Sequence, residues 1–354
     1  MCFLNSLSKI NVGGTTIKKG VKKMEVLVEV TRNPLIESIH RGSIAVMDVV
    51  GNLLAWAGDP GITTFYRSAA KPIQALPVIT SGAADKFGLT DAELAIICSS
   101  HSGEDDHVKV ITDLLEKLGF PLDILQCGTH PPFNSTSAIE IWRKGLQPTA
   151  LHCNCSGKHL GMLAICKVMG WSTDNYLKIE HPLQQLLLAK IKEYHHFNDI
   201  VVGIDGCGVP VYGLPLKEMA KGFARLSKPN ILPAEIANAS KRLVTAMTKH
   251  PKLVAGTGKL DTILMEILGP KVVSKAGAEG VQCLGLLEQG IGIAIKIEDG
   301  AIRATAPTCI EVLRQLGVLS KKELQQLKSK HNVPIKNQRN EIVGEVRPVF
   351  KLNS

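Results

Sequence analysis

Apolar positions alternate with polar ones near both ends of the chain, which is the period of a β-strand. Near the amino end this pattern predicts a hairpin whose strands are joined by a Gly-Asn turn and closed by Gly-Asp-Pro. Near the carboxyl end, runs rich in Val and Ile predict three more strands. The predicted strands cover residues 42–50, 53–57, 271–275, 292–297 and 301–305.

The middle of the chain follows the helical period instead. Two of the predicted helices end at a glycine, Gly119 and Gly170, which is a common helix stop. The predicted helices cover residues 106–118, 158–169, 182–194 and 309–330. Strands at both ends with helices between them predict an α/β fold of the α+β kind. It has one antiparallel sheet formed by both ends of the chain, helices on its faces, and a mostly helical insert.

The net charge of +9 over 354 residues is located at the two ends of the chain. Residues 1–23 contain five lysines and no acidic residue, and residues 321–354 contain eight Lys or Arg against three Glu. The 297 residues between them therefore carry a net charge of −1. A nucleic-acid-binding protein needs a basic face on its folded body, and aromatic residues for base stacking make up only 4% of this chain. The pattern argues against a nucleic-acid partner.

The cysteines and the apolar runs bear on the compartment. The nine cysteines show no short-range paired framework, and no apolar signal peptide precedes them, so we expect a reducing cytoplasm. No apolar run reaches the roughly 18 to 20 residues of a membrane-spanning helix, so we expect no membrane partner. The lysine-rich residues 1–23 mildly resemble a transit peptide, but we favour an overlong start, with the domain proper beginning at Met24.

Ser68 and Lys71 form an S-x-x-K motif where a helix is expected to begin. One helical turn would stack the two side chains, and a partly buried lysine in its neutral form can take the proton of a serine nucleophile. The motif is short, and the alternative is that Ser68 caps the helix while Lys71 is solvated.

Two further motifs extend this pattern. The segment 98–104 is a serine-rich loop that can present Ser100, and the segment 274–280 ends a Val-rich strand with Lys275 followed by small residues. Serine acyl enzymes of the penicillin-recognising type carry S-x-x-K, a second serine loop and K-[ST]-G on a late strand, in this order. The order supports each motif, although the serine loop alone would be interpreted as a turn that caps the next helix.

Two cysteine-containing segments also suggest a site. Residues 152–159 offer His and Cys side chains as metal ligands, and residues 201–210 combine Asp205 and Cys207 with three glycines. The spacing matches no usual zinc pattern, so a metal site remains one alternative and a small buried Cys207 the other.

Taken together, these motifs resemble the asparaginase II family, the rhizobial-type or class 3 L-asparaginases. The resemblance runs from about Met24 to the C-terminus. It implies a fold similar to that of serine β-lactamases and serine-dependent glutaminases, and hydrolysis of L-asparagine to L-aspartate and ammonia. Residues 24–354 are accordingly expected to be one asparaginase II domain, with residues 1–23 as a basic extension. The segments that carry the resemblance are Y-R-S-A-A-K-P-I-Q, C-S-S-H-S-G-E, H-C-N-C-S-G-K-H, D-G-C-G-V-P, H-P-K-L-V-A-G-T-G-K-L-D-T and S-K-A-G-A-E-G.

The resemblance implies two Ser-Lys tandems. They fall on Ser68 with Lys71 and on Ser100 with Lys275, and Ser68 is the expected nucleophile. From its chemistry, Arg67 is expected to bind a substrate carboxylate, because a guanidinium matches that group in bidentate fashion.

The resemblance also implies a zinc ion near the substrate, held by Cys155, Lys158, Cys207 and water. A lysine ligand must be neutral, which is why no standard motif predicts this site. His159 and Asp205 are expected beside the ion as substrate-binding residues.

The chain departs from the family pattern at two positions, and two other functions remain as alternatives to L-asparaginase. Cys153 places a second thiol two residues from Cys155, and Lys259 stands where many relatives are expected to have Arg. A glutaminase or another amino-acid amidase is one alternative, because pocket contacts rather than the Ser-Lys pair set specificity. A non-catalytic penicillin-binding-like protein is the other. The sequence leaves the oligomeric state open, with a homodimer as one option.

Overall fold

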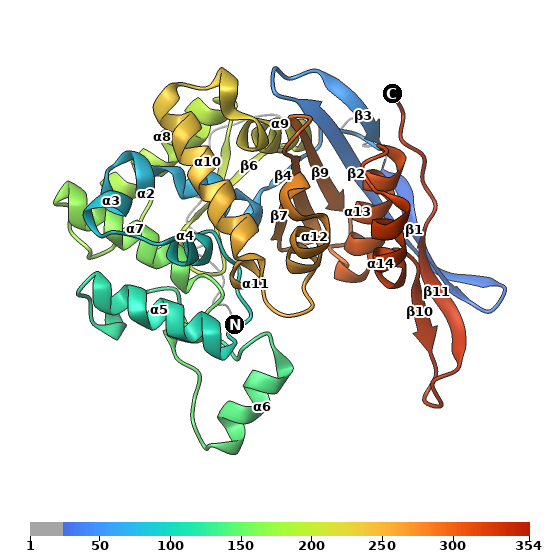
Figure 1. The fold of residues 1–354 in the computed structure, drawn as a ribbon, viewed down its shortest axis with the longest axis horizontal. Helices are drawn as coiled ribbons and strands as arrows, with labels where there is room; N and C mark the ends of the chain where they lie inside the picture. The colour runs from blue at the N-terminus through green and yellow to red at the C-terminus, as the bar shows by residue number, and fades with distance from the viewer. Residues whose placement is uncertain (1–23) are drawn as a thin grey trace, which may run out of the picture.

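The computed structural model describes residues 24–354, and its main element is an antiparallel sheet of eight strands (Figure 1). The strand order is β10-β11-β1-β2-β9-β8-β7, with β3 paired to the far part of β2. Both ends of the described chain contribute strands, which confirms the predicted sheet. The expected basic extension lies outside the described residues. The strands are β1 (Glu25–Arg32), β2 (Leu35–Asp48), β3 (Leu53–Ala57), β7 (Val272–Gly277), β8 (Val281–Leu286), β9 (Ile291–Ile297), β10 (Val333–Lys336) and β11 (Ile342–Pro348).

Helices cover both faces of this sheet. α9 packs on β2, β9 and β8, where Gly292 lets the helix approach so closely that a Cβ would lie 1.8 Å from the carbonyl oxygen of Ala220. α13 packs on β1, β9 and β11, and α14 packs on α13. The two faces enclose a continuous apolar core, in which the paired segments of β2, β8 and β9 are almost entirely buried. The prediction that helices cover the faces of the sheet is confirmed.

The insert between β3 and β7 is mostly helical, as expected (Figure 1). The sequence analysis did not predict its small second sheet, with the order β4-β6-β5. The small-sheet strands are β4 (Thr63–Phe65), β5 (Val201–Ile204) and β6 (Pro210–Pro215). The helices are α1 (Lys71–Gln74), α2 (Leu76–Thr80), α3 (Ala83–Lys86), α4 (Asp91–Ile97), α5 (Asp105–Lys117), α6 (Ser135–Arg143), α7 (Ser156–Met169), α8 (Pro182–His195), α9 (Leu216–Ser227), α10 (Ala234–Lys249), α11 (Pro251–Val254), α12 (Leu260–Leu268), α13 (Ile302–Gln315) and α14 (Lys321–His331).

The small sheet brings together two segments that are far apart in the sequence. β4 and β5 both pair antiparallel with β6, so they run in the same direction on either side of it. The residues that follow them, Arg67 and Asp205, therefore emerge at the same end of the small sheet.

Most predicted elements are confirmed within one or two residues, but β2 begins at Leu35 rather than at the predicted Gly42, and the strand predicted over 301–305 is wrong. These residues begin helix α13. β9, which precedes them, already pairs with β2 on one edge and β8 on the other, so a further strand would have no free ladder to join. The helix predicted over 309–330 is two helices, because Gly317 between them has a φ of 70° that ends α13.

β1, β8, β10 and β11 were not predicted. β10 is only four residues long and contains Pro334, and β11 is interrupted by Gly344, Glu345 and Arg347, so neither shows a sustained apolar alternation. Within residues 24–354, no helix combines the length and apolar character needed to cross a membrane.

Candidate active site

Ser68 lies where the small sheet ends. β4 leads to the fully buried Tyr66, whose backbone N–H donates to the carbonyl oxygen of Tyr212 at 2.8 Å. Arg67 follows with a φ of 52°, a left-handed conformation that is unfavourable for a residue with a Cβ. This bend places the half-buried Ser68 in the first turn of a short 3₁₀ helix, Arg67–Ala70.

Lys71 is fully buried one turn after Ser68 and points toward the serine-rich loop. Its Nζ donates to the carbonyl oxygen of Ser99, to Ser100 Oγ at 3.0 Å and to the carbonyl oxygen of Asn154 at 3.2 Å. Among the described residues no hydrogen bond joins Lys71 to Ser68. The structure thus brings the first lysine to the second serine.

Lys275 reaches the same hydroxyl from the edge strand β7. Its Nζ donates to Ser100 Oγ at 2.9 Å and to the carbonyl oxygen of Ala276 at 2.8 Å. Burial lowers the pKa of Lys275 to about 8, although the nearby Asp261 carboxylate opposes the shift. Ser100 therefore lies between two lysine nitrogens, one of which has an accessible neutral form near pH 8.

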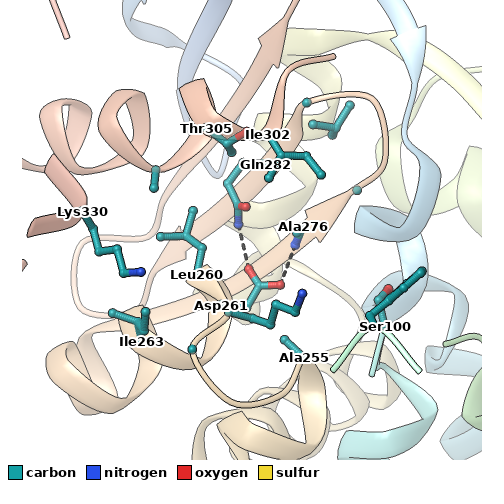
Figure 2. Close-up of a pocket in the computed structure, with 17 residues that line it drawn as sticks. Ser100, Ala255, Leu260, Asp261, Ile263, Ala276, Gln282, Ile302, Thr305 and Lys330 are labelled. Carbon is teal, nitrogen blue, oxygen red and sulfur yellow. Dashed lines mark hydrogen bonds between the residues drawn. The ribbon is translucent and has the colours of Figure 1, made fainter. Parts of the chain in front are cut away.

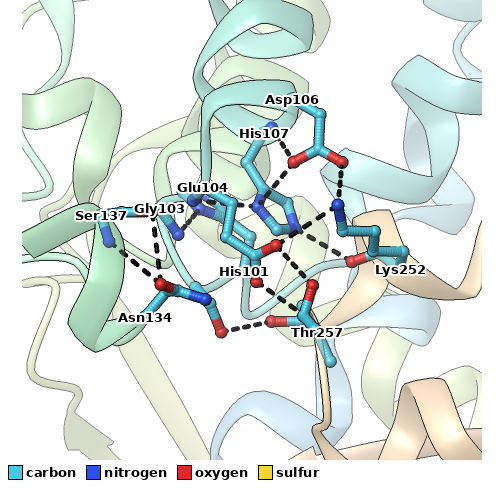
Figure 3. Close-up of polar contacts among 12 residues, drawn as sticks. His101, Gly103, Glu104, Asp106, His107, Asn134, Ser137, Lys252 and Thr257 are labelled. Atoms are coloured by element: carbon cyan, nitrogen blue, oxygen red, sulfur yellow. Dashed lines mark hydrogen bonds and ion pairs between the residues drawn. The ribbon is translucent and has the colours of Figure 1, made fainter.

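The loop that carries Ser100 is anchored to the segment before α12 (Figure 3). The Glu104 carboxylate accepts two hydrogen bonds from Thr257, which outweigh the effect of burial and lower the pKa of Glu104. Because both ends of the loop are held, the position of Ser100 is set by the fold. The other anchors are Ser100 N–H to Val254 O at 2.9 Å and Ser102 Oγ to Ala255 O at 2.7 Å.

Glu104, Asp106 and His107 lie close enough together to suggest a metal site, but their contacts are those of a structural network (Figure 3). Lys252 Nζ lies 3.4 Å from Glu104 and 2.8 Å from Asp106, so a cation already faces both carboxylates. His107 Nδ1 accepts from the Glu104 N–H, and its Nε2 lies 2.9 Å from the carbonyl oxygen of Lys252. No ring nitrogen is left for a metal.

Arg67 and Asp205 form an ion pair at the end of the small sheet. Arg67 donates through Nε at 3.0 Å and through NH2 at 2.9 Å to the same oxygen of Asp205. The side chains are 25% and 11% exposed, so the pair is open on one side. The guanidinium that was expected to bind a substrate carboxylate is thus partly engaged by Asp205.

Cys155, Lys158 and Cys207 are buried together at the start of α7. α7 approaches α4 closely at Gly157, where a Cβ would lie 2.0 Å from the carbonyl oxygen of Ile96. Lys158 Nζ donates to Cys207 Sγ at 3.1 Å, and Cys207 lies close enough to Cys155 to affect the pKa of its thiol. Burial opposes the charged lysine, but the charge of Cys155 and the hydrogen bond to Cys207 raise the pKa of Lys158 above its ordinary value.

Neighbouring groups make Cys155 the thiolate of this cluster. Hydrogen bonds from Cys153 and then Cys207 lower the pKa of Cys155 well below that of a free thiol. By contrast, hydrogen bonds with Cys127 and then Cys155 raise the pKa of the Cys153 thiol. The second thiol noted in the sequence is therefore protonated and serves as a donor.

His159 follows Lys158 on α7 and is fully buried. Its Nδ1 lies 2.7 Å from the hydroxyl of Tyr176, and its Nε2 has no hydrogen-bond partner within residues 24–354. Burial lowers the pKa of His159 to about 3, so the imidazole is neutral.

The serine cluster and the cysteine cluster adjoin each other. Lys71 binds the carbonyl oxygen of Asn154, which directly precedes Cys155 in the chain. The charge of Lys71 also contributes to the low pKa of Cys155. The ten residues predicted for the site thus fall into three adjoining groups: the serine-lysine cluster, the Arg67–Asp205 pair and the cysteine cluster. Within the first group, Ser68 is hydrogen-bonded to neither lysine.

A cavity of about 330 Å³ opens from Ser100 along the outer edge of β7 (Figure 2). At its centre the Asp261 carboxylate is 2% exposed and accepts hydrogen bonds from Ser274 Oγ, Ala276 N–H and Gln282 Nε2 at 2.7 to 2.8 Å. The sequence analysis assigned Asp261 no role. The signal was an acidic residue in an apolar segment shortly before the strand that carries Lys275.

Comparisons with known proteins identify a family for this chain. The model of a family described as L-asparaginase II matches residues 28–348. Among solved structures, a β-lactamase from Mycobacterium bovis is similar at 12% identity and a TM-score of 0.43, covering 77% of this chain and 94% of that one. A protein named Mglu is similar at 12% identity and a TM-score of 0.39, covering 80% of this chain and 63% of that one. No curated protein sequence matches the chain significantly.

Proposed function

The chain belongs to the L-asparaginase II family and is an amidohydrolase, and on this premise we propose that it hydrolyses L-asparagine to L-aspartate and ammonia through an aspartyl-enzyme ester. The observation that supports the mechanism most is the position of Ser100 Oγ, 3.0 Å from Lys71 Nζ and 2.9 Å from Lys275 Nζ. Because two lysine amines are hydrogen-bonded to the same hydroxyl, a proton can move between the amines and the serine.

In the proposed reaction Ser68 is the nucleophile. Its Oγ attacks the carbonyl carbon of the asparagine side-chain amide while a lysine amine accepts its proton. The C–N bond then breaks, and the departing nitrogen takes a proton from the Ser100 hydroxyl, which is replenished by Lys71 or Lys275. Water cleaves the resulting ester by the reverse proton path and regenerates Ser68.

Lys71 is the lysine closest to Ser68 along the chain, but its Nζ is hydrogen-bonded to Ser100. Catalytic hydrogen bonds are often long before substrate binds and shorten in the complex. Ser68 and Lys71 lie one helical turn apart, so a rotation about side-chain bonds is sufficient to connect them. We therefore assign Lys71 and Lys275 jointly to proton transfer.

The Arg67–Asp205 pair suits the other end of the substrate. Free asparagine carries an α-carboxylate and an α-ammonium group, and the pair presents one charge of each sign on an open side. We propose that Arg67 binds the carboxylate and Asp205 the ammonium group, with His159 nearby as a neutral polar group. Such contacts orient the side-chain amide toward Ser68.

The direct test of this function is ammonia release from purified protein with L-asparagine and L-glutamine. We expect kcat/KM for asparagine to exceed that for glutamine at least about tenfold, because one extra methylene misplaces the amide in a site fixed by two charges. Equal or faster turnover of glutamine would support the glutaminase alternative. Binding of asparagine without turnover would support the non-catalytic one.

The cysteine cluster has a donor set that suits zinc. Two sulfur atoms and an amine converge in a buried space, and the unpartnered Nε2 of His159 leaves a polar group beside them. We propose that Cys155, Lys158 and Cys207 hold a zinc ion, which would help to orient substrate. Zinc binding must release the proton of Lys158, whose pKa the sulfurs raise, so uptake should weaken as pH falls.

The metal proposal predicts that Cys207→Ser binds zinc at least about tenfold more weakly than the parent protein. The measurement is bound zinc per chain by elemental analysis after dialysis at several free zinc concentrations. Cys166→Ala is the matched control, because Cys166 is buried on α7 away from the cluster. Equal zinc content in all three proteins would rule out this ligand set.

A further inference from the structure

The cavity beside Ser100 is larger than the proposed reaction requires. When asparagine is the substrate the departing group is ammonia, which fills about the 30 Å³ of one water molecule. The cavity measures about 330 Å³ and has Ser100 and Ala276 at one end. We propose that it is a leaving-group subsite that accepts an apolar amino acid joined through its nitrogen to the aspartate side-chain carbonyl. The proposal rests on the function proposed above.

The location of the subsite follows from the role of Ser100. If Ser68 attacks the carbonyl carbon, Ser100 is the hydroxyl held by two lysines and is the group able to protonate the departing nitrogen. The nitrogen must then lie against Ser100, and anything attached to it must extend away from Ser68. Ser100 lines the cavity whereas Ser68 does not, and the lining continues with Ala276 and Gly277 of β7, an edge strand with no further strand beside it among the described residues.

The walls of the cavity select an apolar group (Figure 2). They are formed by side chains from the start of α12, the start of α13 and the strand β8. Ile302 is 83% exposed, so it offers an uncovered apolar surface at the mouth. The main apolar lining residues are Phe133, Leu260, Ile263, Val281 and Ile302.

The charges of the cavity select a carboxylate. Lys259 and Lys330 both line it, both are exposed, and within residues 24–354 neither takes part in an ion pair. The only acidic lining residue is Asp261, and three donors already occupy its oxygens. The Lys259 and Lys330 ammonium groups therefore favour an occupant with a negative charge. A carboxylate next to an apolar side chain is what an apolar C-terminal residue of a peptide presents.

The chemistry is that of asparagine hydrolysis with a substituted nitrogen. Ser68 Oγ bonds to the aspartyl carbonyl carbon, the C–N bond breaks, and the free amino acid departs with a proton from Ser100. Water then hydrolyses the ester, and no other co-reactant is needed. The predicted substrate class is aspartyl peptides linked through the aspartate side chain to a residue such as leucine.

The test compares aspartate release from β-aspartyl-leucine, β-aspartyl-lysine and L-asparagine by the full-length protein. We expect kcat/KM for β-aspartyl-leucine to exceed that for β-aspartyl-lysine at least about tenfold, because a buried ammonium group lacks a partner in the cavity. Asparagine turnover without turnover of β-aspartyl-leucine would overturn the subsite and leave the proposed function standing. Turnover of neither would overturn both.

Two exposed variants probe the cavity itself. Lys330→Glu and Ile302→Asp should each lower kcat/KM for β-aspartyl-leucine about tenfold and change that for asparagine less than about twofold. Lys328→Glu is the matched control, since Lys328 is exposed on the same helix but does not line the cavity. If Lys330→Glu and Ile302→Asp affect neither substrate, or both equally, the cavity is not a leaving-group subsite.

Discussion

Ser68→Ala should lower kcat for asparagine by about 10³-fold or more, because removing the nucleophile of an acyl enzyme leaves only binding and electrostatic contributions to catalysis. KM should change little, since the Arg67–Asp205 pair that we expect to bind the substrate is untouched. The measurement is ammonia release at saturating asparagine.

The control for this variant is a serine of similar size outside the site. Ser81→Ala changes a half-buried serine after α2 and should retain the parent rate. The thermal unfolding midpoint of Ser68→Ala should match that of the parent, because Ser68 makes no side-chain hydrogen bond to another described residue. A near-parental rate for Ser68→Ala would contradict the nucleophile assignment.

Lys275→Met should lower kcat/KM by about 10²- to 10⁴-fold, the range for loss of a general acid–base group. Lys275→Arg should lose activity to a similar extent, because a guanidinium can still donate to Ser100 but cannot accept a proton. Lys271→Met is the matched control at the start of the same segment, where the side chain is 38% exposed and paired with Glu323.

The pH profile gives a second readout for Lys275. Burial lowers its pKa to about 8, and the groups that act on it are Asp261, Lys71, Cys155 and Cys98. A base is active when neutral, so kcat/KM should rise as pH increases through about 8 and then level off. About one tenth of the lysine is neutral at pH 7. If the limb near pH 8 persists in the residual activity of Lys275→Met, another group titrates.

The sequence predicted those parts of the fold whose signals are local. α7 was predicted nearly to its bounds because its apolar face and the terminal Gly170 both lie within the segment. The wrong strand over 301–305 depended on whether β9 had a free edge, and that is decided by pairing with β2, more than two hundred residues away. β10 and β11 were missed because their stability comes from backbone pairing, of β11 with β1 and of β10 with β11, rather than from an apolar pattern.

In the candidate site, too, the sequence predicted features with a local signal and missed those that depend on tertiary contacts. Ser68 and Lys71 were recognised from a four-residue motif, and Lys275 from the order of three motifs. That Lys71 contacts Ser100 rather than Ser68 could not be predicted, because it depends on how α1 packs beside the serine-rich loop. Asp261 was assigned no role because its three donors come from β7 and β8, which meet it only in the folded chain.

The central claim is that an aspartyl ester forms on Ser68, and the most direct measurement is peptide mass spectrometry of the protein quenched in acid during turnover of asparagine. We expect one aspartyl group on the peptide that contains Ser68, none on that peptide in Ser68→Ala, and accumulation of the same adduct in Ser100→Ala if proton transfer limits its hydrolysis. An adduct on Ser100 in the parent protein would contradict the account.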